Sequence, residues 1–205
     1  MKKLQTAMLG VMLALAGCTS EPPKPAEKPQ PKPPECALAR TALQKLYVAA
    51  HGWARDAQPF RLESQISADC KGQDGKSAIW RAGFASAAQR AVKPYVWSGT
   101  DASDAPPRGI NPGSEDNYSP QNSSTQVFDI AFLKIDSDKA LETAQKHGGD
   151  KILAKAPDTP VLFLLDWSRA SNQLIWHVSY GPSRDDSKLK VDVDASSGDF
   201  IRVEK

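Results

Sequence analysis

Apolar positions along residues 36–100 follow first a helical period and then a strand period. From Cys36 they recur every three or four residues, which predicts an amphipathic helix that ends near His51-Gly52. The following segment alternates apolar and polar side chains, a pattern typical of strands with one buried face. We expect three strands there, at 60–66, 77–84 and 91–97.

A helix followed by strands is also expected in residues 127–205, where one further strand precedes the helix. A strand is expected over 127–135, and Asp136-Ser137-Asp138 then caps a helix that ends at His147-Gly148-Gly149. The remaining expected elements are a short helical segment at 152–156, strands at 161–167, 174–180 and 189–193, and a short strand at 199–203.

Residues 98–124 break the pattern. They hold four prolines, three glycines and few large apolar side chains. We expect a linker or long loop over 101–126.

The two patterned regions also match each other. Ala42-Leu43 in the first helix corresponds to Ala140-Leu141 in the second, 98 positions later. The sequences I-W-R-A-G-F (79–84) and I-W-H-V-S-Y (175–180) share the pattern I-W-[RH]-[AV]-x-[FY], 96 positions apart. We therefore predict an α+β fold of two repeated units, 36–100 and 127–205, each a helix packed on an antiparallel sheet of three to four strands.

The second unit resembles the PepSY-like domains of bacterial envelope proteins. The resemblance rests on the helix entry at 136–140, on the Trp-bearing strand, and on the turn Val193-Asp194-Ala195-Ser196-Ser197-Gly198. The first unit is more divergent, because Trp97-Ser98-Gly99 replaces the Asp-Ala turn. The resemblance implies a domain that binds and sometimes restrains partner proteins, proteases among them, without being an enzyme.

The first residues read as an export signal. Lys2 and Lys3 precede an apolar stretch, 4–15, that is too short to span a bilayer as a helix. It ends in Leu15-Ala16-Gly17-Cys18, which resembles the bacterial lipobox. We expect a signal peptide over 1–17 and a lipid-modified Cys18 that anchors the chain in the bilayer. The alternative is an ordinary signal peptide followed by a chance cysteine.

Residues 18–35 are expected to form a tether. Seven of the 16 prolines fall between positions 22 and 34, and this density favours extended polyproline II. A proline-rich ligand for a partner domain is the alternative. Thr19, rather than Asp, follows the cysteine. Resemblance to the known sorting rule favours the outer membrane, with the protein facing the periplasm.

Cys36 and Cys70 are the other cysteines. Export places them in an oxidising compartment, where two thiols in one small domain suggest a disulfide. Two buried free thiols are the alternative.

Charge and histidine content point to no catalytic chemistry. The chain has 26 basic and 24 acidic residues, which gives no reason to expect a nucleic-acid partner. His51 and His147 lie at expected helix ends, and His177 lies on the face of its strand opposite Trp176. Without a tight ligand spacing or a nucleophile motif, we expect no catalytic residue, no metal site and no cofactor.

Trp53, Trp97 and Trp167 lie near the ends of expected elements, where an indole ring can be half-exposed. Packing within or at the boundary of the core is the simpler interpretation. The sequence favours a non-enzymatic lipoprotein that binds or restrains another envelope protein, and the resemblance adds proteases to the candidate partners. The alternative is a lipoprotein that binds glycan or peptidoglycan through these tryptophans.

Overall fold

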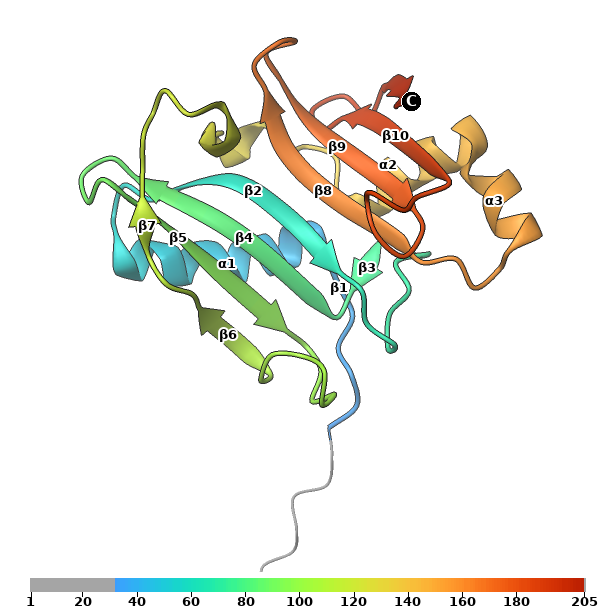
Figure 1. Ribbon diagram of the computed structural model, residues 1–205, viewed down its shortest axis with the longest axis horizontal. Helices are drawn as coiled ribbons and strands as arrows, with labels where there is room; N and C mark the ends of the chain where they lie inside the picture. Colours follow the sequence, from blue (N-terminus) through green and yellow to red (C-terminus); the bar gives the residue numbers. More distant parts are fainter. Residues whose placement is uncertain (1–31, 205) are drawn as a thin grey trace, which may run out of the picture. The chain divides into compact units, whose positions relative to one another are not determined.

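Each half of the chain contributes a helical segment and a run of antiparallel strands (Figure 1). The structure is a computed structural model and describes residues 32–204. The first half contains β1 (Ala37–Leu38), α1 (Ala39–Trp53), β2 (Gln58–Gln65), β3 (Lys76–Ser77), β4 (Ile79–Ser86), β5 (Ala91–Ser98), β6 (Gly109–Pro112) and β7 (Asp116–Asn117). The second half contains η1 (Ser123–Thr125), η2 (Ile130–Phe132), α2 (Ser137–Ala144), η3 (Gln145–Gly149), α3 (Asp150–Lys155), β8 (Val161–Ser168), β9 (Gln173–Tyr180), β10 (Leu189–Asp194) and β11 (Phe200–Val203).

Helix α1 forms where its apolar residues repeat at helical spacing. Its buried side chains fall on one stripe that faces the sheet: Ala39, Ala42, Leu43, Leu46 and Ala50. The helix begins three residues later than predicted, because the residues after Cys36 pair with β3 as strand β1.

Nine strands form one antiparallel sheet. Their order is β11-β10-β9-β8-β2-β4-β5-β6, with β7 paired to the other end of β5. Helices α1 and α2 lie behind the sheet in Figure 1, where α1 packs on β2, β4 and β5 and α2 packs on β9 and β10. The main core lies between these helices and the sheet, so one face of the sheet has neither helix on it.

The central hairpins of the two halves have the same register. Trp80 on β4 pairs with Trp97 on β5, and Trp176 on β9 pairs with Val193 on β10, so that both partners are shifted by 96 positions. The hairpin ends match as well. The backbone N–H of Gly99 donates to the carbonyl of Ala78 at 2.8 Å, and the N–H of Ala195 donates to that of Leu174 at 2.9 Å, again 96 positions on.

The sequence predicts a separate sheet in each half, and here it is wrong. Strands β2 and β8 pair antiparallel in the middle of the sheet, with Leu62 opposite Leu165. Each would otherwise be an exposed edge with unpaired backbone groups, and pairing satisfies both edges at once. The described residues therefore belong to one compact unit.

The strand expected over 127–135 does not form. The 3₁₀ turn η2 occupies its middle, and the side chain of Asp129 accepts a hydrogen bond from the N–H of Ala131 at the start of this turn. Lys134 and Ile135 both donate their N–H groups to the carbonyl of Ala195. Local capping thus replaces the strand that the apolar residues suggested.

The expected linker at 101–126 is partly ordered into the sheet. Strands β6 and β7 lie within it and pair with β5. Pro112, which has no backbone N–H to donate, lies in β6 at the edge of the sheet, where proline is tolerated.

The predicted second helix is divided in two. Asp136 caps α2 by accepting from the N–H of Ser137, as expected. At Gly148 the backbone has a φ of +120°, which glycine adopts without strain, and α3 begins two residues later. Within residues 32–204, no helix combines the length and the apolar character needed to cross a membrane.

Candidate functional site

A row of charged side chains crosses the sheet on the face that has no helix. His177 on β9 lies directly opposite Asp192 on β10, and Asp192 lies opposite Arg202 on β11. Asp166 on β8 approaches the imidazole from the other side. Alternation along each strand puts Trp176, Val191 and Val193 into the core and leaves these polar neighbours on the opposite face.

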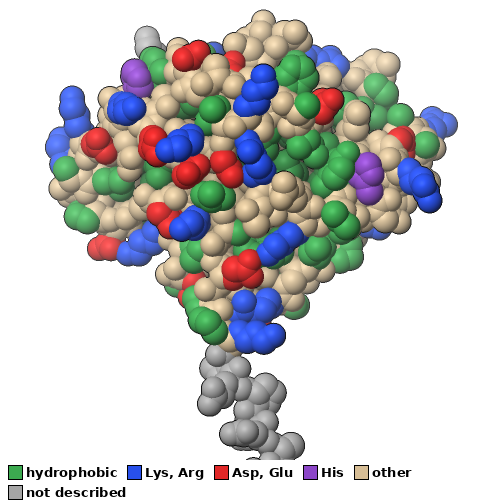
Figure 2. Space-filling model, turned by 180° about the vertical axis from the view of Figure 1, so that it is seen from behind, with side chains coloured by type: hydrophobic (Ala, Val, Ile, Leu, Met, Phe, Trp, Pro, Cys, Tyr) green, Lys and Arg blue, Asp and Glu red, His purple; other side chains and the backbone are tan. Residues whose placement is uncertain are grey.

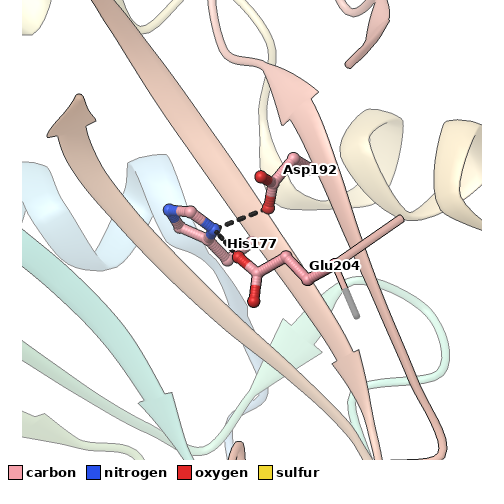
Figure 3. A group of neighbouring side chains, drawn as sticks. All are labelled: His177, Asp192 and Glu204. Carbon is pink, nitrogen blue, oxygen red and sulfur yellow. Dashed lines mark hydrogen bonds and ion pairs between the residues drawn. The ribbon is translucent and has the colours of Figure 1, made fainter. Parts of the chain in front are cut away.

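Carboxylates surround both nitrogens of the His177 ring. Nδ1 lies 2.6 Å from Oδ1 of Asp192 and 2.9 Å from Oε1 of Glu204, and Nε2 lies 3.1 Å from Oδ1 of Asp166. Figure 3 shows Asp192 and Glu204 converging on Nδ1. The histidine therefore faces acceptors on both sides, which favours the doubly protonated imidazolium.

The protonation of His177 follows from this setting. Burial of the ring, whose side chain is 11% exposed, would by itself lower its pKa. Hydrogen bonds to Asp166 and Asp192 and the charges of these carboxylates outweigh burial and raise the pKa to about 9. Near neutral pH the side chain is thus a cation, which does not suit a general base.

Asp192 is the most deeply buried member, with 0% of its side chain exposed. Burial alone would raise its pKa, but the hydrogen bond and charge of His177, together with Glu204 and Arg202, hold the pKa below its ordinary value. Arg202 Nε lies 2.8 Å from Oδ2 of Asp192, yet Oδ2 has no aligned hydrogen bond among the described residues.

The same atoms form a set of potential metal ligands. Each of His177, Asp192 and Glu204 offers one ligand-type atom, and these three atoms lie within 4.8 Å of one another. We expected no metal site because no short ligand spacing occurs in the sequence. The ligands instead come from three segments that the sheet aligns. The available signal was weak: His177 and Asp192 both occupy positions opposite the core face of their strands.

A second candidate site is an apolar groove beside α1. Leu43, Tyr47 and Val48 line it from the helix, and Ile130 and Leu133 line it from the turn at η2, around a cavity of about 470 Å³. Val48 is 74% exposed and Phe132, next to the groove in sequence, is 46% exposed. Figure 2 shows hydrophobic side chains gathered near the middle of this helix-bearing side.

The three tryptophans proposed for binding differ in exposure. Trp97 is 4% exposed and belongs to the core, so its ring is not on the surface. Trp53 and Trp167 are half-buried. Trp53 donates its indole N–H to Glu115 at 3.0 Å, whereas the ring of Trp167 packs edge-on against Phe132 at 5.3 Å between centroids.

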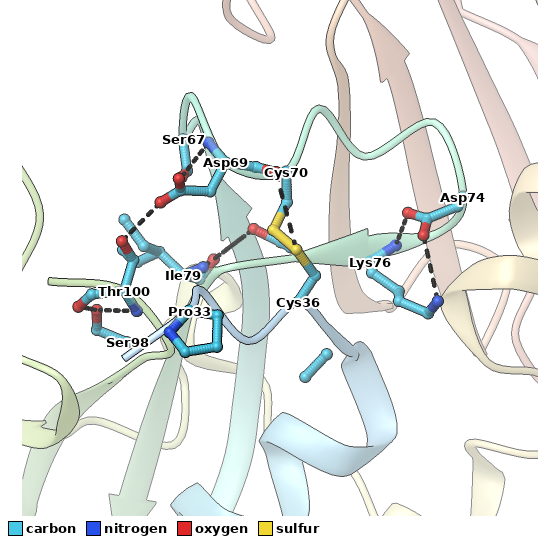
Figure 4. Close-up of a disulfide and its surroundings, with 12 residues drawn as sticks. Pro33, Cys36, Ser67, Asp69, Cys70, Asp74, Lys76, Ile79, Ser98 and Thr100 are labelled. Atoms are coloured by element: carbon cyan, nitrogen blue, oxygen red, sulfur yellow. Dashed lines mark hydrogen bonds and ion pairs between the residues drawn. A yellow bond between two sulfur atoms is a disulfide. The ribbon is translucent and has the colours of Figure 1, made fainter. Parts of the chain in front are cut away.

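The expected disulfide is confirmed. Cys36 and Cys70, which are 34 positions apart in sequence, are bonded, with their Cα atoms 6.2 Å apart. Figure 4 shows that the bond ties the segment before β1 to the loop after β2. Cys18, the expected lipidation site, lies outside the described residues.

Comparison with known proteins finds one resemblance of fold. No protein-family model matches the chain, and no curated protein matches it. The crystal structure of a "putative lipoprotein" from Clostridium difficile 630 superposes with a TM-score of 0.53 at 12% sequence identity. The match covers 86% of this chain and 95% of that one. At this identity the likeness shows a shared fold and nothing more.

Proposed function

We propose that the protein is a lipid-anchored lipoprotein of the bacterial envelope, whose folded unit binds another envelope protein and catalyses no reaction. Anchoring is supported by Leu15-Ala16-Gly17-Cys18 and by the proline-rich stretch behind it. The disulfide between Cys36 and Cys70 adds a structural reason, since such bonds persist in oxidising compartments outside the cytoplasm. Thr19 favours the outer membrane, with the folded unit in the periplasm.

The two halves are taken as tandem PepSY-like units that share one sheet. The support is the common register of β4–β5 and β9–β10, 96 positions apart, together with the matching helix in front of each hairpin. The role that this resemblance implies, binding or restraining a protein such as a protease, agrees with the proposed function.

The groove beside α1 carries the binding proposal. Val48 exposes three quarters of an apolar side chain in the middle of a well-formed helix, next to Leu43, Tyr47, Ile130 and Leu133. An exposed apolar side chain at the rim of an apolar groove is a candidate docking point, because covering it removes apolar surface from water. An apolar segment of a partner protein would fill the groove and cover Val48.

The charged row on the opposite face supports the non-enzymatic part of the proposal. Within residues 32–204, the three side-chain hydrogen bonds of His177 go to carboxylates, and none pairs the imidazole with a hydroxyl or thiol that it could activate.

Site-specific crosslinking tests the binding surface. A photoreactive residue at Val48 should yield a discrete adduct with one envelope protein in intact cells, and Val48→Glu should weaken capture of that protein at least tenfold. Ile110, also apolar and 42% exposed but located on β6, is the matched control position. Equal labelling from both positions would refute the proposal that the groove is the binding surface. If the crosslinked partner is a protease, adding the purified wild-type chain should reduce the activity of that protease, and adding the Val48→Glu variant should not.

Anchoring has its own test. Cys18→Ser, or an inhibitor of the lipoprotein signal peptidase, should prevent lipid labelling of the chain and change its membrane fractionation. Membrane separation then assigns the chain to the inner or the outer membrane. Unaltered labelling in Cys18→Ser would exclude the lipobox interpretation.

Glycan binding is the second candidate. The paired rings of Trp167 and Phe132 next to η2 favour it, because adjacent half-exposed aromatic rings can stack on sugar faces. Titration with soluble peptidoglycan fragments should then quench tryptophan fluorescence in the wild type and less in Trp167→Phe. Unchanged fluorescence would remove this candidate.

A further inference from the structure

More acceptors converge on His177 Nδ1 than one proton can satisfy. Oδ1 of Asp192 lies 2.6 Å away and Oε1 of Glu204 lies 2.9 Å away, so that two carboxylates share a single N–H. The three atoms come from β9, from β10 and from the residue just after β11. Such convergence of one imidazole nitrogen and two carboxylate oxygens is the donor set of a divalent metal ion.

The distances require little movement to admit an ion. Ligands bound at about 2.0–2.2 Å from a tetrahedral metal ion lie roughly 3.3–3.6 Å from one another. The three atoms would therefore need to separate by less than about 1 Å from their present positions. An ion would take the place of the Nδ1 proton.

The surroundings orient these ligands. The other ring nitrogen, Nε2, faces Oδ1 of Asp166 at 3.1 Å, the carboxylate–histidine arrangement that fixes the tautomer of metal-binding imidazoles. Asp192 is fully buried, and its Oδ2 has no aligned hydrogen-bond donor among residues 32–204, although Arg202 Nε lies 2.8 Å away. This ion pair holds the Asp192 carboxylate in place while its Oδ1 faces Nδ1 of His177 at 2.6 Å.

The charges of the group match those of a divalent ion. Asp166, Asp192 and Glu204 carry three negative charges, and Arg202 carries one positive charge. A protonated His177 leaves the group with a net charge of about −1, whereas a neutral His177 with a divalent ion brings it to about zero.

We propose that His177, Asp192 and Glu204 bind a divalent transition-metal ion, with Zn²⁺ as the best match to one imidazole and two carboxylates. Imidazole selects transition metals over Mg²⁺ and Ca²⁺, and water completes the coordination. This site lies on the face of the sheet opposite α1 and is independent of the proposed partner groove.

The ion has a structural consequence at the edge of the sheet. Glu204 follows β11 directly, and its backbone N–H donates to the carbonyl of Lys190 at 3.0 Å. Through Glu204 the ion therefore links the short edge strand β11 to β9 and β10. Binding of the ion should stabilise β11 more than the centre of the sheet.

Metal binding by the full chain, purified in detergent and stripped with a chelator, tests the site. Equilibrium dialysis against Zn²⁺ followed by elemental analysis should give one ion per chain. Glu204→Gln and Asp166→Asn should each weaken binding at least tenfold. Glu142→Gln, on helix α2, is the matched control that should bind as the wild type does. Circular dichroism should show that each variant is folded.

Two further measurements separate a metal site from adventitious binding. Co²⁺ should give visible absorption bands that Glu204→Gln lacks, and Zn²⁺ should slow amide hydrogen exchange in β11 of the wild type only. Binding of Zn²⁺ that is equal in wild type and Glu204→Gln would overturn the site. So would the absence of stoichiometric Zn²⁺, or preferential binding of Mg²⁺ or Ca²⁺.

Discussion

Asp136 caps the helix of the other half as well as its own. Its Oδ1 accepts hydrogen bonds from the backbone N–H of Ser137 at 2.8 Å and from the backbone N–H of Arg40 at 3.0 Å. Ser137 Oγ accepts from the N–H of Ala39 at 3.1 Å. Leu38, the N-cap residue of α1, has no side-chain acceptor, so the start of α2 supplies the caps that α1 lacks.

Replacing this shared cap should destabilise both helix starts. Asp136→Ala should lower the free energy of unfolding by about 1–2 kcal/mol, at the upper end for a lost N-cap because two N–H groups lose their acceptor. Urea denaturation measures the change. Asp129→Ala, which removes the cap of the short turn η2 alone, is the control and should cost less. Equal losses would show that the bond to Arg40 contributes nothing.

Loss of the disulfide should destabilise the fold without changing it. The Cys36→Ala, Cys70→Ala double variant should lose roughly 3–4 kcal/mol, because the bond closes a loop of 34 positions and restricts the unfolded chain. A reducing agent should shift the urea midpoint of the wild type to that of the double variant. It should leave the variant itself unaffected, and a shift in the variant would point to another cause.

The two central tryptophans should respond alike to substitution. Trp80 Nε1 donates to the carbonyl of Ala37, and Trp176 Nε1 donates to that of Ile135, each at 2.9 Å. Trp80→Phe and Trp176→Phe should each cost about 1–3 kcal/mol, since each loses the indole hydrogen bond and removes part of a core ring. Thermal denaturation compares them. A large cost for one and almost none for the other would contradict the equivalence of the two tryptophan positions.

Asp56 should make stability depend on pH in the acid range. The Ser86 hydroxyl and the N–H of Ala88 donate to its carboxylate and lower its pKa from the ordinary 3.8. Its contribution is therefore complete above the unfolded pKa and disappears as pH falls through the lower, folded pKa. The urea midpoint of the wild type should exceed that of Asp56→Asn at pH 7, and the difference should shrink as the pH is lowered below 3.8. A constant difference would contradict this assignment.

Local pattern predicted the elements whose partners lie close in sequence. Apolar spacing placed α1 and the hairpin strands within a few residues, because burying one stripe or one face imposes a period on the sequence. The strand predicted over 127–135 does not form, because this segment does not bury one continuous face. Phe128 and Leu133 are buried, whereas Phe132 is exposed. Burial of these separate side chains is compatible with a turn and does not require a strand.

The candidate sites were harder to predict than the fold. The groove beside α1 joins the helix to a turn more than 80 positions away, and neither segment alone marks it. Trp97 was a candidate for exposure, but β5 turns its ring into the core. Such outcomes depend on which face of an element meets its neighbour, and that is decided by packing across the whole unit.

The sequence by itself determined the helix-and-hairpin pattern and the equivalent positions of Trp80 and Trp176, and it suggested the disulfide between Cys36 and Cys70 that the structure contains. Only the tertiary structure decided that both halves share one sheet and that His177 meets Asp192 and Glu204. Pairing between β2 and β8, and the alignment of β9, β10 and β11, bring together residues distant in the chain. The energy of those contacts depends on edges and registers that no local window of sequence contains.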